Sequence, residues 1–180
     1  SPDLEPKQWS LQTWVYADEF GKEGDARRWL VSKNDNEWAE GHYALLLDGK
    51  HPMAYLNIGG GPEHVVSLRA TQAIKRREWH QVAATYDGKL FCLFVDGKPA
   101  GQVEVGKPRM AGSGRFSVGQ RPDGHVHFKG RLDEVVLSDE VWTAERVSEA
   151  YNSPERTRDW PALLRLDFDH LTDSERREAE

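Results

Sequence analysis

Short apolar runs alternate with polar turn signals along most of this chain of 180 residues. The clearest example lies between residues 79 and 98, where apolar runs at 82–86 and 90–95 are separated by Asp87-Gly88. A second pair, Asp96-Gly97, closes the second run. Asp-Gly is a strong hairpin signal because a tight primed turn needs positive φ at its central residues. The segment therefore predicts three consecutive antiparallel strands.

The same pattern continues on both sides of this segment. Further strand-like runs lie at residues 9–16, 29–33, 42–47, 53–58, 65–68, 101–105, 115–118, 131–137 and 163–169. Many short strands at a spacing of roughly 8–12 residues are typical of a β-sandwich or barrel. One helix is predicted after Thr143, a plausible N-cap, because Val147, Ala150 and Tyr151 then form one apolar stripe. The pattern thus predicts an all-β, antiparallel fold with one short C-terminal helix.

Length and composition narrow the classes of function. A chain of this length is expected to form one domain and to bury roughly 70% of its unfolded surface, so it needs no disulfides or metal to fold. Its formal net charge is -6 and its one short basic run is at 75–77, which argues against nucleic acid as a partner. No apolar run approaches the roughly 20 residues that span a membrane, so membrane insertion is not expected.

Two segments in combination resemble one known family. They are WHQVAATYDGKLFCLFVDGK at 79–98 and GRLDEV at 130–135, and together they are similar to the laminin-G-like, concanavalin A-like jelly roll of lectins and glucanases. WSLQTWVYADE, WLVSKNDN, GHYALLLDGK, RFSVG and the rest of FKGRLDEVVLSDEVWTAERV extend the resemblance over roughly residues 9–151. The resemblance implies a two-sheet antiparallel jelly-roll β-sandwich. We expect one domain over residues 1–170, followed by a disordered charged tail at 171–180.

One departure from the family pattern concerns the first strand, which has no counterpart before residue 9. The run at 163–169 (LLRLDFD) resembles that missing strand, placed at the end of the chain. It could fill the same slot, pair at another edge or begin a following module. We favour the first alternative, because an unfilled slot would leave an exposed strand edge.

Asp133 is the candidate metal ligand. The resemblance implies that an Asp on this closing strand can bind a structural Ca²⁺ together with backbone carbonyls of an early loop. Ca²⁺ takes six to eight oxygens, so one Asp cannot form the site alone. The alternative is a carboxylate that accepts backbone hydrogen bonds or pairs with an arginine. Asp167 and Asp169, on one side of the last run, form a second calcium candidate.

Catalytic residues are not expected. Retaining glucanases of the resembling fold carry Glu-x-Asp-x-x-Glu on one strand, which brings two carboxylates about 5–5.5 Å apart. This chain has no such string. Strand alternation would send the neighbouring acids Asp133 and Glu134 to opposite faces. The sequence therefore predicts a protein that is not an enzyme.

The candidate binding loop lies in the polar stretch KNDNEWAEGH, where burial does not obviously explain a tryptophan. A lectin stacks sugar rings on exposed aromatic residues and hydrogen-bonds their hydroxyls with polar ones. The candidate ligand-binding residues are Asn34, Asp35, Asn36 and Trp38, with Tyr43 and Tyr55 nearby on the same sheet. The alternative is that Trp38 caps the edge of the core. The remaining tryptophans at 9, 14, 29 and 79 are expected to pack in the sandwich, and Trp142 to pin the helix to a sheet.

These observations predict a non-catalytic module that binds carbohydrate, or a protein surface, within a larger exported bacterial protein. The location would then be extracytoplasmic. Two alternatives stay open: a glycan-active enzyme domain and a structural accessory domain.

Overall fold

The computed structural model describes residues 4–24, 27–124 and 126–153, and the backbone of residues 164–166. One sheet consists of β1 (Trp9–Ala17), β6 (Trp79–Tyr86), β7 (Leu90–Val95), β8 (Lys98–Glu104), β10 (Gly130–Ser138) and β11 (Leu164–Leu166). The other consists of β2 (Arg28–Lys33), β3 (Tyr43–Asp48), β4 (His51–Asn57), β5 (Val65–Arg69) and β9 (Phe116–Val118). A 3-10 turn, η2 (Pro62–His64), follows β4, and the helix α1 (Ala144–Asn152) follows β10.

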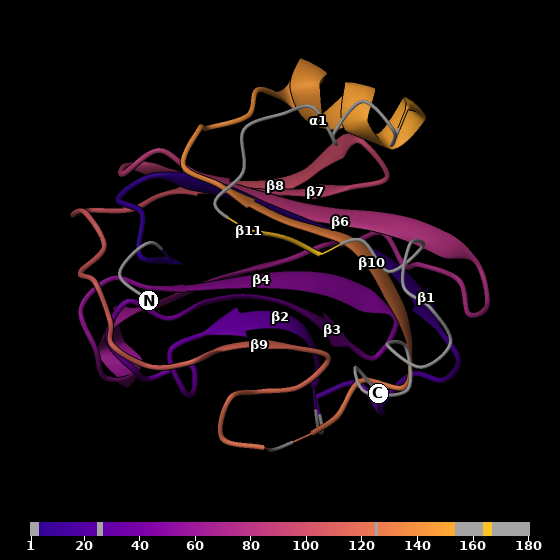
Figure 1. Ribbon diagram of the computed structural model, residues 1–180, viewed down its shortest axis with the longest axis horizontal. Coiled ribbons are helices and arrows are strands. Elements are labelled where there is room, and N and C mark those ends of the chain that lie inside the picture. Colours follow the sequence, from indigo (N-terminus) through magenta and orange to yellow (C-terminus); the bar gives the residue numbers. More distant parts are fainter. Residues whose placement is uncertain (1–3, 25–26, 125, 154–163, 167–180) are drawn as a thin grey trace.

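The strands form two antiparallel sheets that lie face to face (Figure 1). The six-stranded sheet has the order β11-β10-β1-β6-β7-β8, and the five-stranded sheet has the order β5-β4-β3-β2-β9. Helix α1 lies over the outer face of the six-stranded sheet (Figure 1). The predicted two-sheet antiparallel sandwich with one short C-terminal helix is confirmed.

Both Asp-Gly pairs lie in tight turns between neighbouring strands, but only Asp96-Gly97 has positive φ at both residues, as the sequence predicts. Gly88 has φ 94, and the Asp87 carboxylate accepts the backbone N–H of Leu90 at 2.6 Å. Asp96 and Gly97 have φ 50 and 71, the pair of positive values that a type I′ turn requires. The strands β6, β7 and β8 therefore follow one another as neighbours in the sheet, as predicted.

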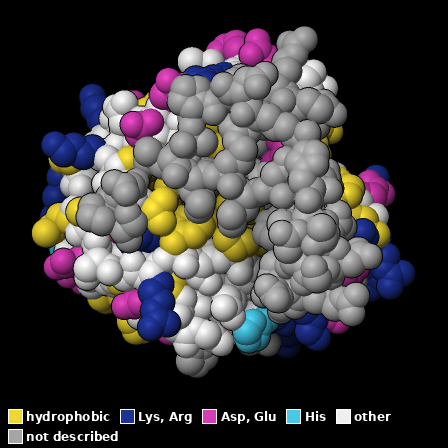
Figure 2. All heavy atoms as spheres, in the orientation of Figure 1, with side chains coloured by type: hydrophobic (Ala, Val, Ile, Leu, Met, Phe, Trp, Pro, Cys, Tyr) yellow, Lys and Arg dark blue, Asp and Glu magenta, His cyan; other side chains and the backbone are white. Residues whose placement is uncertain are grey.

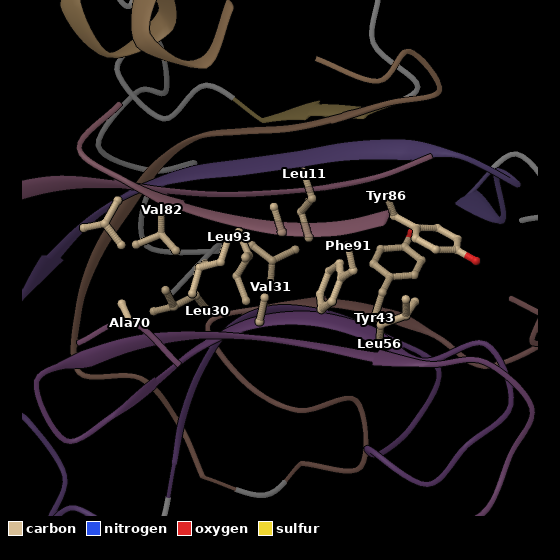
Figure 3. Packing of buried hydrophobic residues seen from close by; sticks show 14 of the residues in the cluster. Leu11, Leu30, Val31, Tyr43, Leu56, Ala70, Val82, Tyr86, Phe91 and Leu93 are labelled. Carbon is tan, nitrogen blue, oxygen red and sulfur yellow. The ribbon is translucent and has the colours of Figure 1, made fainter. Parts of the chain in front are cut away.

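The main core fills the space between the two sheets. In Figure 3, Leu11, Phe91 and Leu93 of one sheet face Leu30 and Tyr43 of the other. Trp9 is fully buried at the start of β1, and its ring centroid lies 5.0 Å from that of Tyr43. The predicted core position of Trp9 is confirmed.

Each sheet also carries a small apolar cluster on its outer face. The cluster on the six-stranded sheet packs under α1 and consists of Ala83, Phe94, Val136, Trp142 and Val147. Trp142 thereby pins the helix to the sheet, as predicted. The cluster on the five-stranded sheet consists of Trp29, Ala44, Leu46, Met53 and Tyr55, with Val126 packed against it.

Three tryptophans expected in the sandwich core lie elsewhere. Trp29 is buried, but on the outer face of the five-stranded sheet. Trp14 is partly exposed on the outer face of the other sheet and stacks on Tyr151 of α1, with ring centroids 5.6 Å apart. Trp79, the first residue of β6, is 41% exposed. The expectation of core packing was wrong for these three, because aromatic residues also serve the outer faces and strand ends.

A bulge interrupts the pairing of β1 with β10. Gln12 lies opposite Val136 and Trp14 opposite Asp133, so Thr13 faces two residues of β10. One of these, Glu134, has φ 42, the left-handed backbone of an inserted residue. Simple alternation, from which we placed Asp133 and Glu134 on opposite faces, therefore does not hold across this point.

The predicted last strand forms β11 and covers the outer edge of β10. Leu164 lies opposite Leu137 and Leu166 opposite Val135. The edge strand on the other side of this sheet, β8, carries exposed Lys98, Pro99 and Glu104. Residues 167–180, with the predicted calcium ligands Asp167 and Asp169 and the predicted disordered tail, lie outside the described residues.

Candidate functional site

Three loops meet at one end of the sandwich, and we call them the loop rim: residues 34–41, 58–64 and 106–115. The backbone N–H of Gly61 donates to the Trp38 carbonyl at 2.8 Å, and that of Met110 donates to the Ile58 carbonyl at 3.1 Å. Among the described residues, three large hydrophobic side chains are exposed, and two of them, Trp38 (59%) and Met110 (50%), lie on this rim.

A buried ionic group holds the rim together. The Glu5 carboxylate lies 2.6 Å from the Lys33 ammonium and 2.7 Å from the Arg109 guanidinium, and all three side chains are nearly inaccessible. It also accepts the backbone N–H of Gly112 at 3.1 Å. Burial by itself raises the pKa of Glu5, but the hydrogen bonds from Lys33, Arg109, Asn34 and Gly112 outweigh it and lower that pKa. Glu5 is therefore ionised and links the N-terminal segment to two of the rim loops.

Asn34 belongs to this structural group and not to a ligand-binding surface. Its backbone is left-handed, with φ 68, and its residue is 1% exposed. Its amide oxygen accepts from the Lys33 ammonium at 2.9 Å and from the backbone N–H of Gly114 at 2.8 Å. Its amide nitrogen donates to Glu5 at 2.9 Å and to the Gly41 carbonyl at 3.0 Å. These four bonds use the hydrogen-bonding capacity of the amide, so Asn34 has none left for a ligand.

Close backbone contacts between the loops require glycine. A Cβ at Gly112 would lie 2.2 Å from the Glu40 carbonyl oxygen, and one at Gly41 would lie 2.3 Å from that of Met110. Gly41 also has φ 64, a conformation that costs other residues free energy. The rim loops are thus fixed against one another by backbone as well as by side chains.

His42 is a buried residue that contacts the first rim loop. It is fully buried, its Nδ1 lies 2.9 Å from the Asn34 carbonyl, and its ring stands edge-on to Trp29. Because a carbonyl only accepts, Nδ1 carries the proton of the neutral ring. Burial lowers the pKa of His42 to about 4. His42 is therefore neutral at physiological pH.

The structure brings three of the predicted binding residues together at the tip of the first rim loop. Asp35 is exposed with φ 36, and the Asn36 side chain accepts the backbone N–H of Trp38 at 2.9 Å. This bond fixes the local turn, and the Trp38 side chain is exposed there. Asp35, Asn36 and Trp38 therefore form one group, in which Asp35 and Trp38 are exposed and Asn36 is half-buried.

The two predicted tyrosines are not part of that group. Tyr43 is fully buried between the sheets, and its hydroxyl donates to the Leu4 carbonyl at 2.8 Å. Burial raises the pKa of Tyr43. Tyr55 is 4% exposed on the opposite face of the same sheet, where it packs edge-on against Trp29. Both tyrosines thus lie on the same sheet, as expected, and both are buried.

Several rim residues were not anticipated from the sequence. Glu37 pairs with Arg121 at 2.9 Å, and its carbonyl accepts the Asn57 amide at 2.9 Å. The Lys107 ammonium lies 3.2 Å from Nε2 of His64. Met110 could have been found by the signal used for Trp38, since it too is apolar in a polar stretch.

The predicted calcium ligand Asp133 lies in β10 beside the bulge. Its side chain accepts the backbone N–H of Glu134 at 2.8 Å, and its carbonyl accepts the Thr13 hydroxyl at 3.2 Å. Within the described part of the chain, no group of three or more His, Cys, Asp and Glu side chains could hold a metal ion. Calcium binding stays a prediction.

The surface carries charged side chains of both signs. On the side shown in Figure 2, the Lys and Arg side chains of described residues are intermixed with Asp and Glu and form no continuous basic stripe. No helix in the described residues is long and apolar enough to cross a membrane.

Comparison with known families and proteins gives a consistent picture of the fold. A family model described as the concanavalin A-like lectin/glucanases superfamily matches residues 1–148. Comparison with curated proteins gives no match.

Several solved structures are similar to this chain. One is a Bacteroides ovatus protein inferred to bind carbohydrate (TM-score 0.70, 15% identity), which covers 92% of this chain, whereas this chain spans 46% of that one. Another is domain 4 of AbnA, an extracellular arabinanase of Geobacillus stearothermophilus, in complex with arabinotriose (TM-score 0.64, 17% identity). The match covers 81% of this chain and 66% of that one. A third is the CBM40 of the Ruminococcus gnavus IT-sialidase, bound to α2,3 sialyllactose (TM-score 0.63, 15% identity). The match covers 81% of this chain and 83% of that one. At these identities the likeness concerns the fold.

Proposed function

This chain belongs to the concanavalin A-like lectin/glucanases superfamily, and from that premise we propose that it is a non-catalytic module that binds carbohydrate at the loop rim. The observation that carries the proposal is the 59% exposure of Trp38 on a loop whose backbone is otherwise fixed. A rigid loop that holds an indole in solvent does so without stabilising the core. Ligand binding would account for an exposed tryptophan at such a position.

The chemistry of the rim suits a sugar. An indole ring offers a flat apolar surface to the C–H face of a pyranose or furanose ring, and exposed Asp35 and half-buried Asn36 lie on the same loop. Carboxylate and amide oxygens accept hydrogen bonds from sugar hydroxyls. Because the buried Glu5 group fixes the loop, little conformational entropy would be lost on binding.

The similar structures support a binding role. Two of them are named as complexes with saccharides, and a third is inferred to bind carbohydrate. By analogy with these relatives, one of which is part of an extracellular enzyme, we place this module outside the cytoplasm and within a larger protein. A glycan is then the expected partner.

A glycan array probed with the full chain tests the proposal. We expect binding to one class of glycan, and a loss of about tenfold or more in affinity for Trp38→Ala, since an aromatic stacking contact is removed. For glycans without a carboxylate, Trp79→Ala is the matched control, because Trp79 is a second exposed tryptophan away from the rim. Binding at the rim should survive that change. An array without signal for the unmodified chain, or equal losses for both variants, would overturn the proposal.

Calcium at Asp133 is tested separately. If Asp133 holds a structural Ca²⁺, the melting temperature should fall when a chelator is added and recover with excess Ca²⁺, because a ligand that binds only the folded state stabilises it. Asp133→Asn should lose that response. A melting temperature that ignores both chelator and Ca²⁺ would reject the site.

A further inference from the structure

A second exposed aromatic group lies at the far end of β1, and we call it the arginine–tryptophan patch. Trp79 of β6 lies opposite Tyr16 of β1, which in turn lies opposite Arg131 of β10. The ring centroids of Tyr16 and Trp79 are 5.5 Å apart. The guanidinium carbon of Arg131 lies 4.0 Å from the Tyr16 centroid and 5.9 Å from that of Trp79. Three neighbouring strands thus bring these side chains together on the outer face of the six-stranded sheet.

The patch presents a tryptophan and an arginine to solvent together. Trp79 is 41% exposed, and Arg131 is exposed as well. Within the described residues, the contacts of the Arg131 guanidinium are with aromatic rings, and no carboxylate forms an ion pair with it. Its neighbour Lys129, by contrast, pairs with Glu19. Within that part of the chain, the N–H donors of Arg131 are therefore available to an outside acceptor.

From this arrangement we propose that the arginine–tryptophan patch binds a saccharide unit that carries a carboxylate. A guanidinium offers only donors, in a planar fork that matches the two oxygens of a carboxylate. The indole of Trp79 offers a surface on which the sugar ring can stack. A neutral sugar could stack on the Trp79 indole, but it would give the Arg131 guanidinium no carboxylate to bind.

The strands hold the patch in place before any ligand arrives. Tyr16, Trp79 and Arg131 are anchored at paired strand positions, and the cation–π contact with Tyr16 restrains the guanidinium. Two residues earlier on the same side of β1, Trp14 stacks on Tyr151 of α1 and extends the aromatic surface. A preorganised site of this kind loses little side-chain entropy on binding.

Asp133 lies close to the arginine–tryptophan patch on β10. It lies opposite Trp14, two residues along β10 from Arg131. The carboxylate accepts the backbone N–H of Glu134 at 2.8 Å, and it adds a negative charge close to the patch.

The patch is distinct from the loop rim, and the inference does not depend on the proposed function of that rim. Trp9, at the other end of β1, packs on Tyr43 next to the rim. Tyr16 is seven residues further along the strand, which corresponds to roughly 23 Å. The two exposed tryptophans therefore lie too far apart to touch the same sugar ring.

Isothermal titration of the full chain with trigalacturonic acid, and with the neutral galactose trimer as a comparison, tests this inference. We expect the acid to bind more tightly than the neutral trimer. Trp79→Ala and Arg131→Gln should each weaken the acid by about tenfold or more, and Arg131→Lys by a smaller factor, since it keeps the charge and loses the fork. Trp38→Ala, which tests the rim, should leave this affinity unchanged.

Three results would overturn the inference. They are absence of acid binding, equal binding of the acidic and neutral trimers, and acid binding that survives both Trp79→Ala and Arg131→Gln. Loss of acid binding in Trp38→Ala alone would move the acidic site to the rim and would also overturn it. Melting temperatures of the variants, measured on the same samples, show that each is folded.

Discussion

The loop rim and the arginine–tryptophan patch each expose one tryptophan, but different forces hold the two in place. The rim depends on Glu5, buried between two cations, and on glycines at close backbone contacts. The patch depends on the pairing of three strands, without a buried charge. Side chains on paired strands stay in place as long as the sheet is folded. The rim loops, by contrast, depend on the buried ionic group around Glu5. Substitutions should therefore separate the two regions by their energetic cost.

The largest expected effect is that of Glu5→Gln. It removes the anion from between Lys33 and Arg109 and leaves two buried positive charges unpaired, which should lower the free energy of unfolding by about 3–5 kcal/mol. Urea denaturation measures the change. Arg131→Gln in the patch is the matched control and should cost no more than about 1 kcal/mol. If both cost the same, the rim does not depend on its buried charges.

The second-largest effect should be a decrease in the free energy of unfolding as pH falls. The folded-state pKa of His42 is about 4, below the ordinary value of 6.5, so the unfolded chain binds the proton first as pH falls. Stability should therefore decrease between about pH 6.5 and pH 4, by on the order of 3 kcal/mol in total from this group. The lowered pKa of Glu5 acts in the same direction at still lower pH.

Urea unfolding at several pH values tests the contribution of His42. His42→Asn keeps a donor for the Asn34 carbonyl but does not titrate, so its stability should change less over this range. A variant with the same pH dependence as the unmodified protein would contradict the assignment.

Two glycines with similar backbone angles sharpen the comparison further. Gly41 (φ 64) and Gly119 (φ 75) are both left-handed, but only at Gly41 would a Cβ meet another atom. Gly119→Ala should cost only the strain of the left-handed backbone, about 1–2 kcal/mol. Gly41→Ala should cost about 1–3 kcal/mol more, because the Met110 carbonyl must move. Thermal unfolding of the pair measures the difference, and equal costs would mean that the rim loops separate easily.

The smallest effects should come from the two exposed tryptophans. Trp38→Ala should change the free energy of unfolding by about 0.5 kcal/mol or less, as expected for a surface side chain. Trp79→Ala loses its contact with Tyr16 and should cost about 1 kcal/mol. A larger cost for Trp38 would support the alternative that it caps the edge of the core.

The sequence predicts those features that depend on neighbours along the chain. The Asp-Gly turns, the cap at Thr143 and the exposure of Trp38 all follow from residues a few positions apart. The ionic group around Glu5 does not, because Glu5 contacts Asn34, Arg109 and Gly112 across 29, 104 and 107 residues. No local pattern could have shown that Asn34 serves the fold.

The orientations of Tyr43 and Tyr55 could not be predicted for a different reason. Both faces of β3 and β4 are covered, so the two strands are apolar at nearly every position and show no alternation. Without alternation, nothing in the sequence says which tyrosine faces the core. The strand positions of Tyr16 and Arg131 were inside predicted strands, but only the register places them beside Trp79.

The edge strand β8 bears on how the domain behaves when crowded. Pro99 lacks a backbone N–H, and exposed Lys98 and Glu104 bring charge to the same edge. β11 occupies the opposite edge of this sheet. The β8 edge is therefore a poor template for strand addition, and concentrated or tandemly arrayed copies should not polymerise through it.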